Sequence, residues 1–296
     1  MKITKSIYFL ILLFYTNTSF AQLSDLARVD YTYIPKDGSD IEYMGLRVLF
    51  NYPIKLKKEG EYLLLGLDYS NIHLRMANNN LQINKESIDD FKLFDLNIGY
   101  TKPLKNDWRL GVRFKPGLST NLESRALQFE DVVFSGDLVF IRDRKKTNYN
   151  KKPNRLILGI SFSESRGIPY PLPFISYYRK FHSKWSYNIG IPKMNLQYHT
   201  SDKSRFKLYA ALDGFTSNLQ NGVLIENDKV AERMNMSLIL GGLKYEYHFL
   251  DHFEFFVLSS YIISNSVRLK DSNNNNVVSL NNANSTYFRT GIRLKI

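Results

Sequence analysis

Strict alternation of apolar and polar residues is the feature that most constrains this chain. The stretch WRLGVRFKPGL at 108–118 places Trp, Leu, Val and Phe on one face of an extended strand, and Arg, Gly, Arg and Lys on the other. About fourteen such segments recur, each near the nine to eleven residues that a tilted strand needs to cross a bilayer. No stretch of the sequence has a convincing amphipathic-helix pattern. The segments are 26–34, 44–52, 61–70, 93–100, 108–118, 132–141, 155–164, 172–181, 184–191, 194–200, 204–214, 234–249, 252–264 and 286–296.

The connections between these segments alternate in length. The short ones are 101–107, 180–184, 200–204 and 249–253, and the long polar ones are 73–90, 119–131, 213–235 and 266–285. Only 141–155 and 190–193 depart from this alternation. The sequence therefore predicts an all-β fold, a closed antiparallel transmembrane β-barrel of about 12–14 strands with short periplasmic turns and long outer loops. Fourteen is the direct count, and twelve follows if 184–200 is one bent strand or if the first segment does not pair.

Aromatic residues gather at the predicted strand ends. The chain holds 20 Tyr and 20 Phe. An amphipathic ring prefers the headgroup level of a bilayer, so these positions predict an aromatic girdle, whereas a soluble β-sandwich would scatter its rings through a core. The pairs that flank short turns are Tyr52 and Tyr62, Tyr100 and Trp108, Phe181 and Trp185, Tyr198 and Phe206, and Phe249 and Phe253.

The first 21 residues have the pattern of a secretory signal peptide. Two lysines precede an apolar run over 7–15, and small residues suit cleavage after Ala21. The expected domains are a signal peptide over 1–21 and an outer-membrane β-barrel domain over 22–296. The chain has no cysteine, so we expect neither a lipid anchor at the N-terminus nor a disulfide framework. The predicted location is the outer membrane of a Gram-negative bacterium.

The charge of the mature chain narrows the range of partners. Removing 21 of the 296 residues removes two of the 40 Lys+Arg and none of the 28 Asp+Glu, which leaves a net charge of +10. Such an excess suits nucleic acid, anionic lipid or an anionic solute. An exported chain without a nucleic-acid-binding module argues against nucleic acid. A mean hydropathy of −0.30 without a long apolar run after the signal excludes a helical membrane protein.

Strand parity places many charged side chains on the face opposite the apolar one, toward the predicted lumen. Two interpretations stay open, a basic pore that attracts small anions or a lumen filled by paired acids and bases. Arg289, Arg293 and Lys295 come from the last strand, where few acids lie nearby in the chain, and we expect unpaired positive charge there. The predicted inward bases are Arg47, Arg109, Arg113, Lys115, Lys207, Lys244, Arg289, Arg293 and Lys295, and the acids are Asp68, Asp95, Asp137, Asp213, Glu246 and Glu254. The candidate anion path comprises Arg47, Arg109, Arg113, Lys115, Arg289, Arg293 and Lys295.

Histidine patterns do not favour a metal site or an enzyme. His248 and His252 in HFLDH have a spacing that suits a metal on a helix, but here they span a predicted strand, turn and strand. A barrel hydrolase needs a Ser/His or Asp/His pair within hydrogen-bond reach near the outer rim. His182 and His199, like the HFLDH pair, fall at the turn side, and only His73 lies near the outer side. We therefore predict no enzyme, no metal and no cofactor.

Some predicted outer loops have unusual composition. The asparagine runs Asn78–Asn80 and Asn273–Asn276 could bind glycans or metal ions, although solvated low complexity is the ordinary explanation. The stiff stretch GIPYPLP at 167–173 either folds inward as a constriction or caps the rim, and we favour the cap.

The stretch from Phe174 to Asn218 resembles a family of bacterial outer-membrane β-barrels described only as a domain of unknown function. The motifs that carry the resemblance are SYYRKFHSKWSYNIGIPK and LQYHTSDKSRFKLYAALDG. The resemblance extends over most of the mature chain and implies a barrel and a location, but no substrate.

These observations predict a passive outer-membrane barrel, either a narrow channel or a structural barrel with an anion preference. The alternative is a surface binding protein that uses its long outer loops for a glycan or protein partner, and an outer-membrane lipid or peptide hydrolase is less favoured. The expected partners are outer-membrane lipid, a small anionic solute and, during biogenesis, the outer-membrane assembly machinery. That machinery reads terminal strands such as TYFRTGIRLKI at 286–296, where Ile296 replaces the more usual Phe.

Overall fold

The structure is a computed structural model, and it describes residues 25–36, 41–76, 88–124, 126–144, 153–168, 170–225, 229–280 and 284–295. The predicted signal peptide over 1–21, the run Asn78–Asn80 and the terminal Ile296 lie outside the described residues. Among the described residues, no helix is long and apolar enough to cross a membrane.

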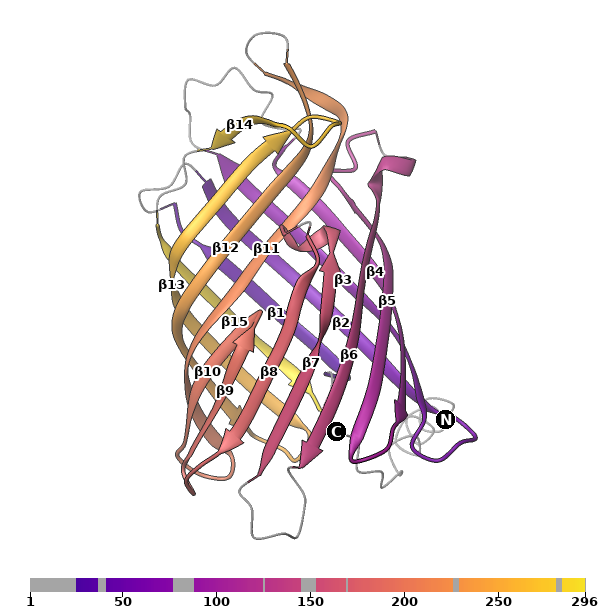
Figure 1. The fold of residues 1–296 in the computed structure, drawn as a ribbon. Coiled ribbons are helices and arrows are strands. Elements are labelled where there is room, and N and C mark those ends of the chain that lie inside the picture. Colours follow the sequence, from indigo (N-terminus) through magenta and orange to yellow (C-terminus); the bar gives the residue numbers. More distant parts are fainter. Residues whose placement is uncertain are drawn as a thin grey trace, which may run out of the picture.

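The described chain forms one sheet of fifteen strands and two short 3-10 helices (Figure 1). The helices are η2 (Phe129–Asp131) and η3 (Glu164–Arg166). The strands are β1 (Ala27–Ile34), β2 (Ile41–Lys55), β3 (Tyr62–Met76), β4 (Asp90–Pro103), β5 (Trp108–Thr120), β6 (Val132–Arg144), β7 (Asn154–Ser163), β8 (Leu172–Lys180), β9 (Trp185–Ile191), β10 (Lys193–His199), β11 (Ser204–Ile225), β12 (Lys229–His248), β13 (Phe253–Lys270), β14 (Asn276–Leu280) and β15 (Thr286–Leu294).

The sheet closes into a barrel of fourteen antiparallel strands, which confirms the direct count from the sequence. Each strand from β1 to β13 pairs with the next along the chain, and β15 pairs with both β13 and β1. The strand β14 stands outside this wall, because its pairing in the described structure is with the far end of β13. The alternative of twelve strands is wrong, since β9 and β10 form a separate hairpin and β1 pairs on both edges.

Five short connections lie at one end of the barrel, which we call the turn end, and we call the opposite end the loop end. The connections over 56–61, 104–107, 181–184, 200–203 and 249–252 lie at the turn end. The first and last strands also start and finish there, since Ala27 pairs with Leu294. The predicted loop over 213–235 is wrong, because β11 and β12 continue as strands through most of it.

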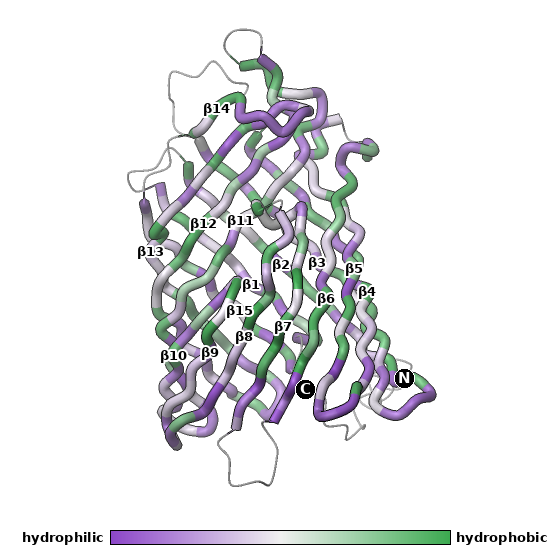
Figure 2. The backbone as a smooth tube through the Cα atoms, viewed as in Figure 1, coloured by the Kyte–Doolittle hydropathy of each residue, from purple (hydrophilic) through white to green (hydrophobic). Residues whose placement is uncertain are grey.

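The outward face of the wall is apolar all round. Outward residues such as Phe50, Phe114, Leu208, Leu243 and Ile292 are exposed, while their strand neighbours on the inner face are polar or buried. Figure 2 shows this alternation of hydropathy along the strands. A continuous exposed apolar band is unsuited to water and suited to lipid, so the chain is a transmembrane β-barrel.

Aromatic side chains surround the barrel at the turn end, as the sequence predicts. Trp185 lies 4.8 Å from Tyr198 between ring centroids, and Phe249 lies 5.8 Å from Phe253. The first pair joins neighbouring strands β9 and β10 and the second spans the turn between β12 and β13, at the level where an interfacial girdle stabilises a membrane barrel.

The wall narrows toward the loop end because β11 leaves β10 and reaches β5. Asn218 forms a parallel bridge with Thr120, the Asn121 N–H donates to the Asn218 carbonyl at 3.2 Å, and the Ser119 hydroxyl donates to Thr216 at 2.7 Å. Strands β6 to β10 end below this bridge. The circuit of strands at the loop end is therefore β1–β5, β11–β13 and β15.

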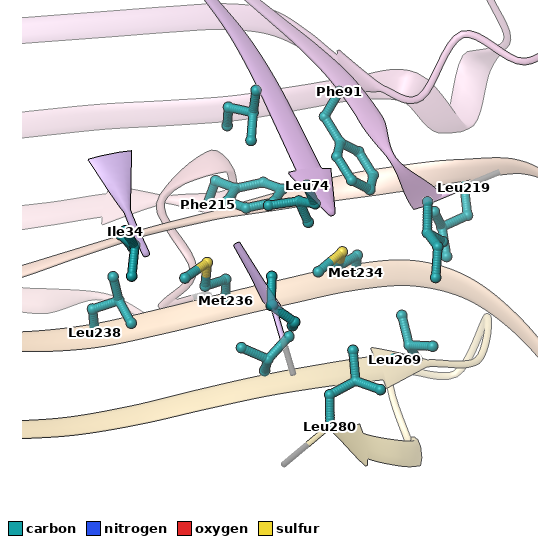
Figure 3. Packing of buried hydrophobic residues seen from close by; sticks show 14 of the residues in the cluster. Ile34, Leu74, Phe91, Phe215, Leu219, Met234, Met236, Leu238, Leu269 and Leu280 are labelled. Carbon is teal, nitrogen blue, oxygen red and sulfur yellow. The ribbon is translucent and has the colours of Figure 1, made fainter. Parts of the chain in front are cut away.

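The lumen of this narrower part is filled with apolar side chains, which we call the plug (Figure 3). Phe215 lies 5.3 Å from Phe91 and 6.2 Å from Tyr43 between ring centroids, and Met234 and Met236 lie beside them. The plug comprises Ile34, Ile41, Ile72, Leu74, Ile88, Phe91, Phe215, Leu219, Val223, Ile225, Ala231, Met234, Met236, Leu238, Leu240, Ile262, Val267, Leu269, Leu280 and Tyr287. The sequence did not predict the plug, because the parts of β11 and β12 that lie within 213–235 have the polar composition of a loop.

Candidate functional site

Paired charges line one wall of the lumen near the middle of strands β2 to β6. Arg47 Nε lies 2.8 Å from Asp68 Oδ1, and Lys115 Nζ lies 2.8 Å from Asp95 Oδ2 and 3.6 Å from Asp68 Oδ2. These contacts, which we call the ladder, run across β2 to β5. They continue to β6, where Arg113 Nε lies 2.6 Å from Asp137 Oδ2. The acids match the bases here, as the interpretation of a paired interior predicts.

Arg109 is placed differently from the other predicted lumen bases. Its Nη1 donates to the Gly60 carbonyl at 2.7 Å, in the connection between β2 and β3. The guanidinium therefore stabilises the rim of the turn end and lies away from the ladder.

Two buried glutamates on β12 and β13 form the centre of a cationic cluster on the opposite wall. Glu246 is 1% exposed and Glu254 is 0% exposed as side chains. Glu246 contacts Lys207 and Lys244, each at 2.8 Å, and Glu254 contacts Lys295 at 2.7 Å. Arg205 and Arg293 each bind both carboxylates. Two acids thus hold five cations.

The expectation of unpaired charge on the last strand is wrong. Arg289 lies 2.8 Å from Asp213 and 3.4 Å from Asp30, while Arg293 and Lys295 bind the two glutamates of the cluster. These acids come from β1 and β13, which pair with β15, and from β11 and β12, whose side chains meet Arg289 and Arg293 inside the barrel.

An inward phenylalanine compensates for part of the shortage of acids. The Phe256 ring centroid lies 4.5 Å from Lys244 Nζ, 4.8 Å from the Arg293 guanidinium and 5.3 Å from that of Arg28. The negative face of an aromatic ring attracts cations without neutralising them. The cluster therefore keeps its positive excess.

A cavity of about 510 Å³ lies against this cluster. Nine basic residues line it and only two acids do, and three further acids, Asp30, Asp213 and Glu254, contact Arg289 and Lys295 from outside the lining. The basic residues are Arg28, Arg155, Lys193, Arg205, Lys207, Lys244, Arg289, Arg293 and Lys295, and the acids are Asp25 and Glu246. A confined cavity lined by one sign of charge concentrates ions of the other sign.

The wall of the cavity formed by β7 to β10 carries no acid among its lining residues, and it combines the basic side chains of Arg155, Lys193 and His199 with amide and hydroxyl groups. Ser176 Oγ donates to Asn188 Oδ1 at 2.7 Å, and Asn195 and Gln197 face the same space. Amide and hydroxyl groups can donate hydrogen bonds to an anion. Both halves of the cavity thus supply positive charge, and the β7–β10 half adds neutral hydrogen-bonding groups.

Strand alternation could have identified more of this site from the sequence. Arg28 and Asp30 alternate with the outward Val29 and Tyr31 on β1, and Arg205 alternates with Phe206 at the start of β11. Both segments carry the same two-residue period as the predicted lumen bases. What the period does not show is that β1 and β11 face one another across the cavity.

The histidines have separate partners. His248 Nε2 lies 3.0 Å from Glu254, whereas His252 Nδ1 lies 3.1 Å from the Lys295 carbonyl. His199 Nε2 lies 2.9 Å from Ser186 Oγ, but Ser186 is 0% exposed, so no substrate can reach its hydroxyl in this conformation.

Comparison with known proteins gives a family and similar barrels. A family model described as Domain of unknown function (DUF6268) matches residues 17–295. No curated protein matches the sequence.

Solved structures similar to the chain include outer-membrane porins. NanC porin has a TM-score of 0.37 and 9% identity over 91% of this chain and 100% of that chain. KdgM porin has a TM-score of 0.36 and 8% identity over 91% and 99%. The outer membrane phospholipase A from Escherichia coli has a TM-score of 0.32 and 10% identity over 95% of each chain. Because these TM-scores are low, we infer the strand count and the function from the barrel itself.

Proposed function

The chain belongs to the family described as a domain of unknown function (DUF6268), and from that premise we propose that it is a passive outer-membrane barrel that admits small anionic solutes. The observation that carries the proposal is the cavity of about 510 Å³ lined by nine basic residues and two acids. A water-filled lumen selects ions through the sign of the charges that line it.

The two walls of the lumen have different roles in this proposal. The ladder across β2 to β6 pairs its charges and stabilises the barrel. The cluster around Glu246 and Glu254 keeps an excess of cations that attracts the solute. Of the predicted anion path, Arg293, Lys295 and Arg289 line the cavity, whereas Arg47, Arg113 and Lys115 belong to the ladder.

The proposed orientation places the turn end in the periplasm and the loop end outside the cell, after export directed by residues 1–21. Outer-membrane barrels have short periplasmic turns and long outer loops, which is the arrangement of the connections here. Solute then enters the cavity from the periplasmic side. Because the plug fills the loop end, passage across the whole membrane needs movement of the plug or a different exit.

Proteoliposomes test the anion preference. We expect uptake of a small organic anion to exceed that of a cation of equal size several-fold, and a salt gradient across a planar bilayer to give a reversal potential of the anion-selective sign. Replacing Lys207 and Lys244 together by Gln lowers that preference. The matched control is Lys57→Gln with Lys58→Gln, which removes the same two charges from an exposed turn at 56–61.

Two results contradict the proposal. Equal uptake of anion and cation shows that the charged cavity does not select the solute. No uptake and no conductance by folded protein leaves only the structural barrel. Deletion of outer loops that abolishes binding of a glycan or protein, with uptake unchanged, instead supports the surface binding protein.

A further inference from the structure

A row of polar side chains crosses the cavity wall from β7 to β11. The row consists of Arg155, Tyr178, Asn188, Asn195 and Tyr209, each of which pairs with the next across neighbouring strands. All five side chains line the cavity. Directly paired residues on one face of a sheet have their Cβ atoms about 4.5–5.5 Å apart. The two amides at the centre of the row therefore lie side by side on the hairpin of β9 and β10.

Two lysines lie next to these amides, one step closer to the turn end. Gln197 shares the inner face of β10 with Asn195, two residues before it. Gln197 pairs with Lys207 on β11, and Lys207 pairs with Lys244 on β12. Both lysines contact Glu246, a carboxylate that they share with two arginines. An anionic group bound by the lysines would therefore lie within reach of the hairpin amides.

The hairpin amides are buried, and their hydrogen bonding is incomplete. Asn188 is 8% exposed and Gln197 is 7% exposed. Asn188 Oδ1 accepts from the Ser176 hydroxyl at 2.7 Å, and Gln197 Nε2 donates to Asn195 Oδ1 at 2.6 Å. Within the described ranges of the chain, no group bonds to Asn188 Nδ2, Asn195 Nδ2 or Gln197 Oε1. Because buried polar groups require partners, two donors and one acceptor are available to a molecule in the cavity.

This combination of groups selects among anions by their hydroxyl content. A hydroxyl both donates and accepts, whereas an ionised carboxylate only accepts. Amide donors beside an amide acceptor therefore complement neighbouring hydroxyls better than they complement an anionic group alone. The cations complement a carboxylate or a phosphate through charge-assisted hydrogen bonds. The cavity volume of about 510 Å³ lies in the range of sites that bind small molecules.

We infer that the cavity binds a small polyhydroxylated anion, a sugar acid or a sugar phosphate. Its anionic group lies beside Lys207 and Lys244, and its hydroxyls bond to Asn188, Asn195 and Gln197. The inference rests on the proposed function of the positive cavity, and it adds the ligand class and the residues that select it. The cations select the charge of the ligand, and the hairpin amides select its hydroxyls.

Titration calorimetry on the detergent-solubilised barrel tests the ligand class with matched probes. Glucuronate carries a carboxylate and several hydroxyls on a six-membered ring, cyclohexanecarboxylate carries the carboxylate alone, and methyl glucoside carries the hydroxyls alone. We expect glucuronate to bind at least tenfold more tightly than either of the other two. Glucose 6-phosphate, compared with inorganic phosphate, repeats the test for a phosphate. The tighter of the two sugar anions identifies the preferred anionic group.

Variants separate the two parts of the site. In Asn188→Leu with Gln197→Met, which nearly keeps the side-chain volumes, the advantage of glucuronate over cyclohexanecarboxylate should fall below twofold. In Lys207→Gln with Lys244→Gln, both carboxylates should bind several-fold more weakly and their ratio should stay the same. The matched control is Asn71→Leu, which replaces an exposed amide on β3 outside the cavity lining and should change neither affinity. Thermal melting followed by circular dichroism shows that each variant is folded.

Three outcomes overturn the inference. They are the absence of any advantage of both sugar anions over their matched probes, binding of methyl glucoside as tight as that of glucuronate, and a glucuronate advantage that persists in the folded amide variant. The first two concern the unmodified protein, so they decide even if the double variant does not fold. If one of the three occurs while small anions still enter proteoliposomes preferentially, the inference fails and the proposed function stands. If that preference is also absent, both fail.

Discussion

The two ends of the lumen differ although the same strands build both. Along β11 the inward residues change from Arg205 and Lys207 near the turn end to Phe215 and Leu219 near the loop end. Along β12 they change from Glu246 and Lys244 to Leu240, Leu238 and Met236. Alternation alone therefore sets which side chains face inward. Position along the strand sets whether the inward face is a charged cavity or an apolar core.

The two ends are also stabilised by different forces. The plug removes apolar surface from water and packs rings and methionines closely, as in a soluble protein. The cavity holds charges that are stable only with partners, and its few acids are shared among many bases. Mutations in the plug should therefore affect stability alone, whereas mutations in the charged cavity should also change selectivity.

The largest expected effect is in the plug. Phe215→Ala leaves a void between Tyr43 and Phe91 and lowers the free energy of unfolding by about 4 kcal/mol. Urea unfolding in vesicles, followed by tryptophan fluorescence, measures the loss. The control Phe114→Ala removes an outward ring and should cost clearly less. A loss at Phe215 no greater than at Phe114 contradicts a packed plug.

Next in size is the centre of the cationic cluster. Glu246→Gln removes the one carboxylate that Lys207 and Lys244 contact and one of the two that Arg205 and Arg293 share, and it lowers the free energy of unfolding by about 3 kcal/mol. Unlike the plug variant, it should also raise the anion preference in the reversal-potential measurement. An unchanged anion preference would show that the cluster does not determine selectivity.

A moderate effect is expected where β11 closes onto the far wall. Gln220 is buried, donates to Asp131 at 2.6 Å and to the Ala126 carbonyl at 2.8 Å, and accepts from Ser124. Gln220→Ala removes these bonds and lowers the free energy of unfolding by about 2 kcal/mol. Hydrogen exchange should increase around Asn218 before it increases in β2 or β3. Uniform exchange would show that the narrowing is not a separate structural unit.

The smallest effect is expected at an exposed ion pair of the turn end. Asp107 lies 3.2 Å from Arg144, and both side chains are exposed to water. Asp107→Asn should change the free energy of unfolding by less than about 1 kcal/mol. The same urea titration measures it, and a loss as large as that of Glu246→Gln would contradict the distinction between buried and exposed carboxylates.

The fold could be predicted from the sequence because strand alternation is local. The fourteen wall strands, the short turns and the aromatic girdle all follow from residues within one or two segments. The extension of β11 through 215–225 could not be predicted, since Ser217, Asn218 and Gln220 have loop composition. The partners of Asn218 and Gln220, such as Asp131 and Asn121, lie 87 to 99 residues away.

The site was predicted in part for the same reason. Parity correctly placed Lys207, Lys244, Glu246 and Arg293 on the inner face. It could not show which acids would meet Arg289, because those acids arrive through closure of the barrel. The plug and the short hairpin of β9 and β10 likewise depend on the length of each strand, which no local pattern specifies.

Cysteine accessibility tests the central claim most directly, namely a positive cavity at the turn end below a sealed loop end. Asn195→Cys places a thiol in the cavity, and Ala231→Cys places one in the plug. An anionic sulfonatoethyl methanethiosulfonate and its cationic trimethylammonium counterpart are applied to each, and every rate is divided by that of a free thiol in solution. The account predicts that position 195 reacts faster with the anionic reagent and that position 231 reacts with neither. Modification of position 231 as fast as position 195, or a faster cationic reaction at position 195, would contradict it.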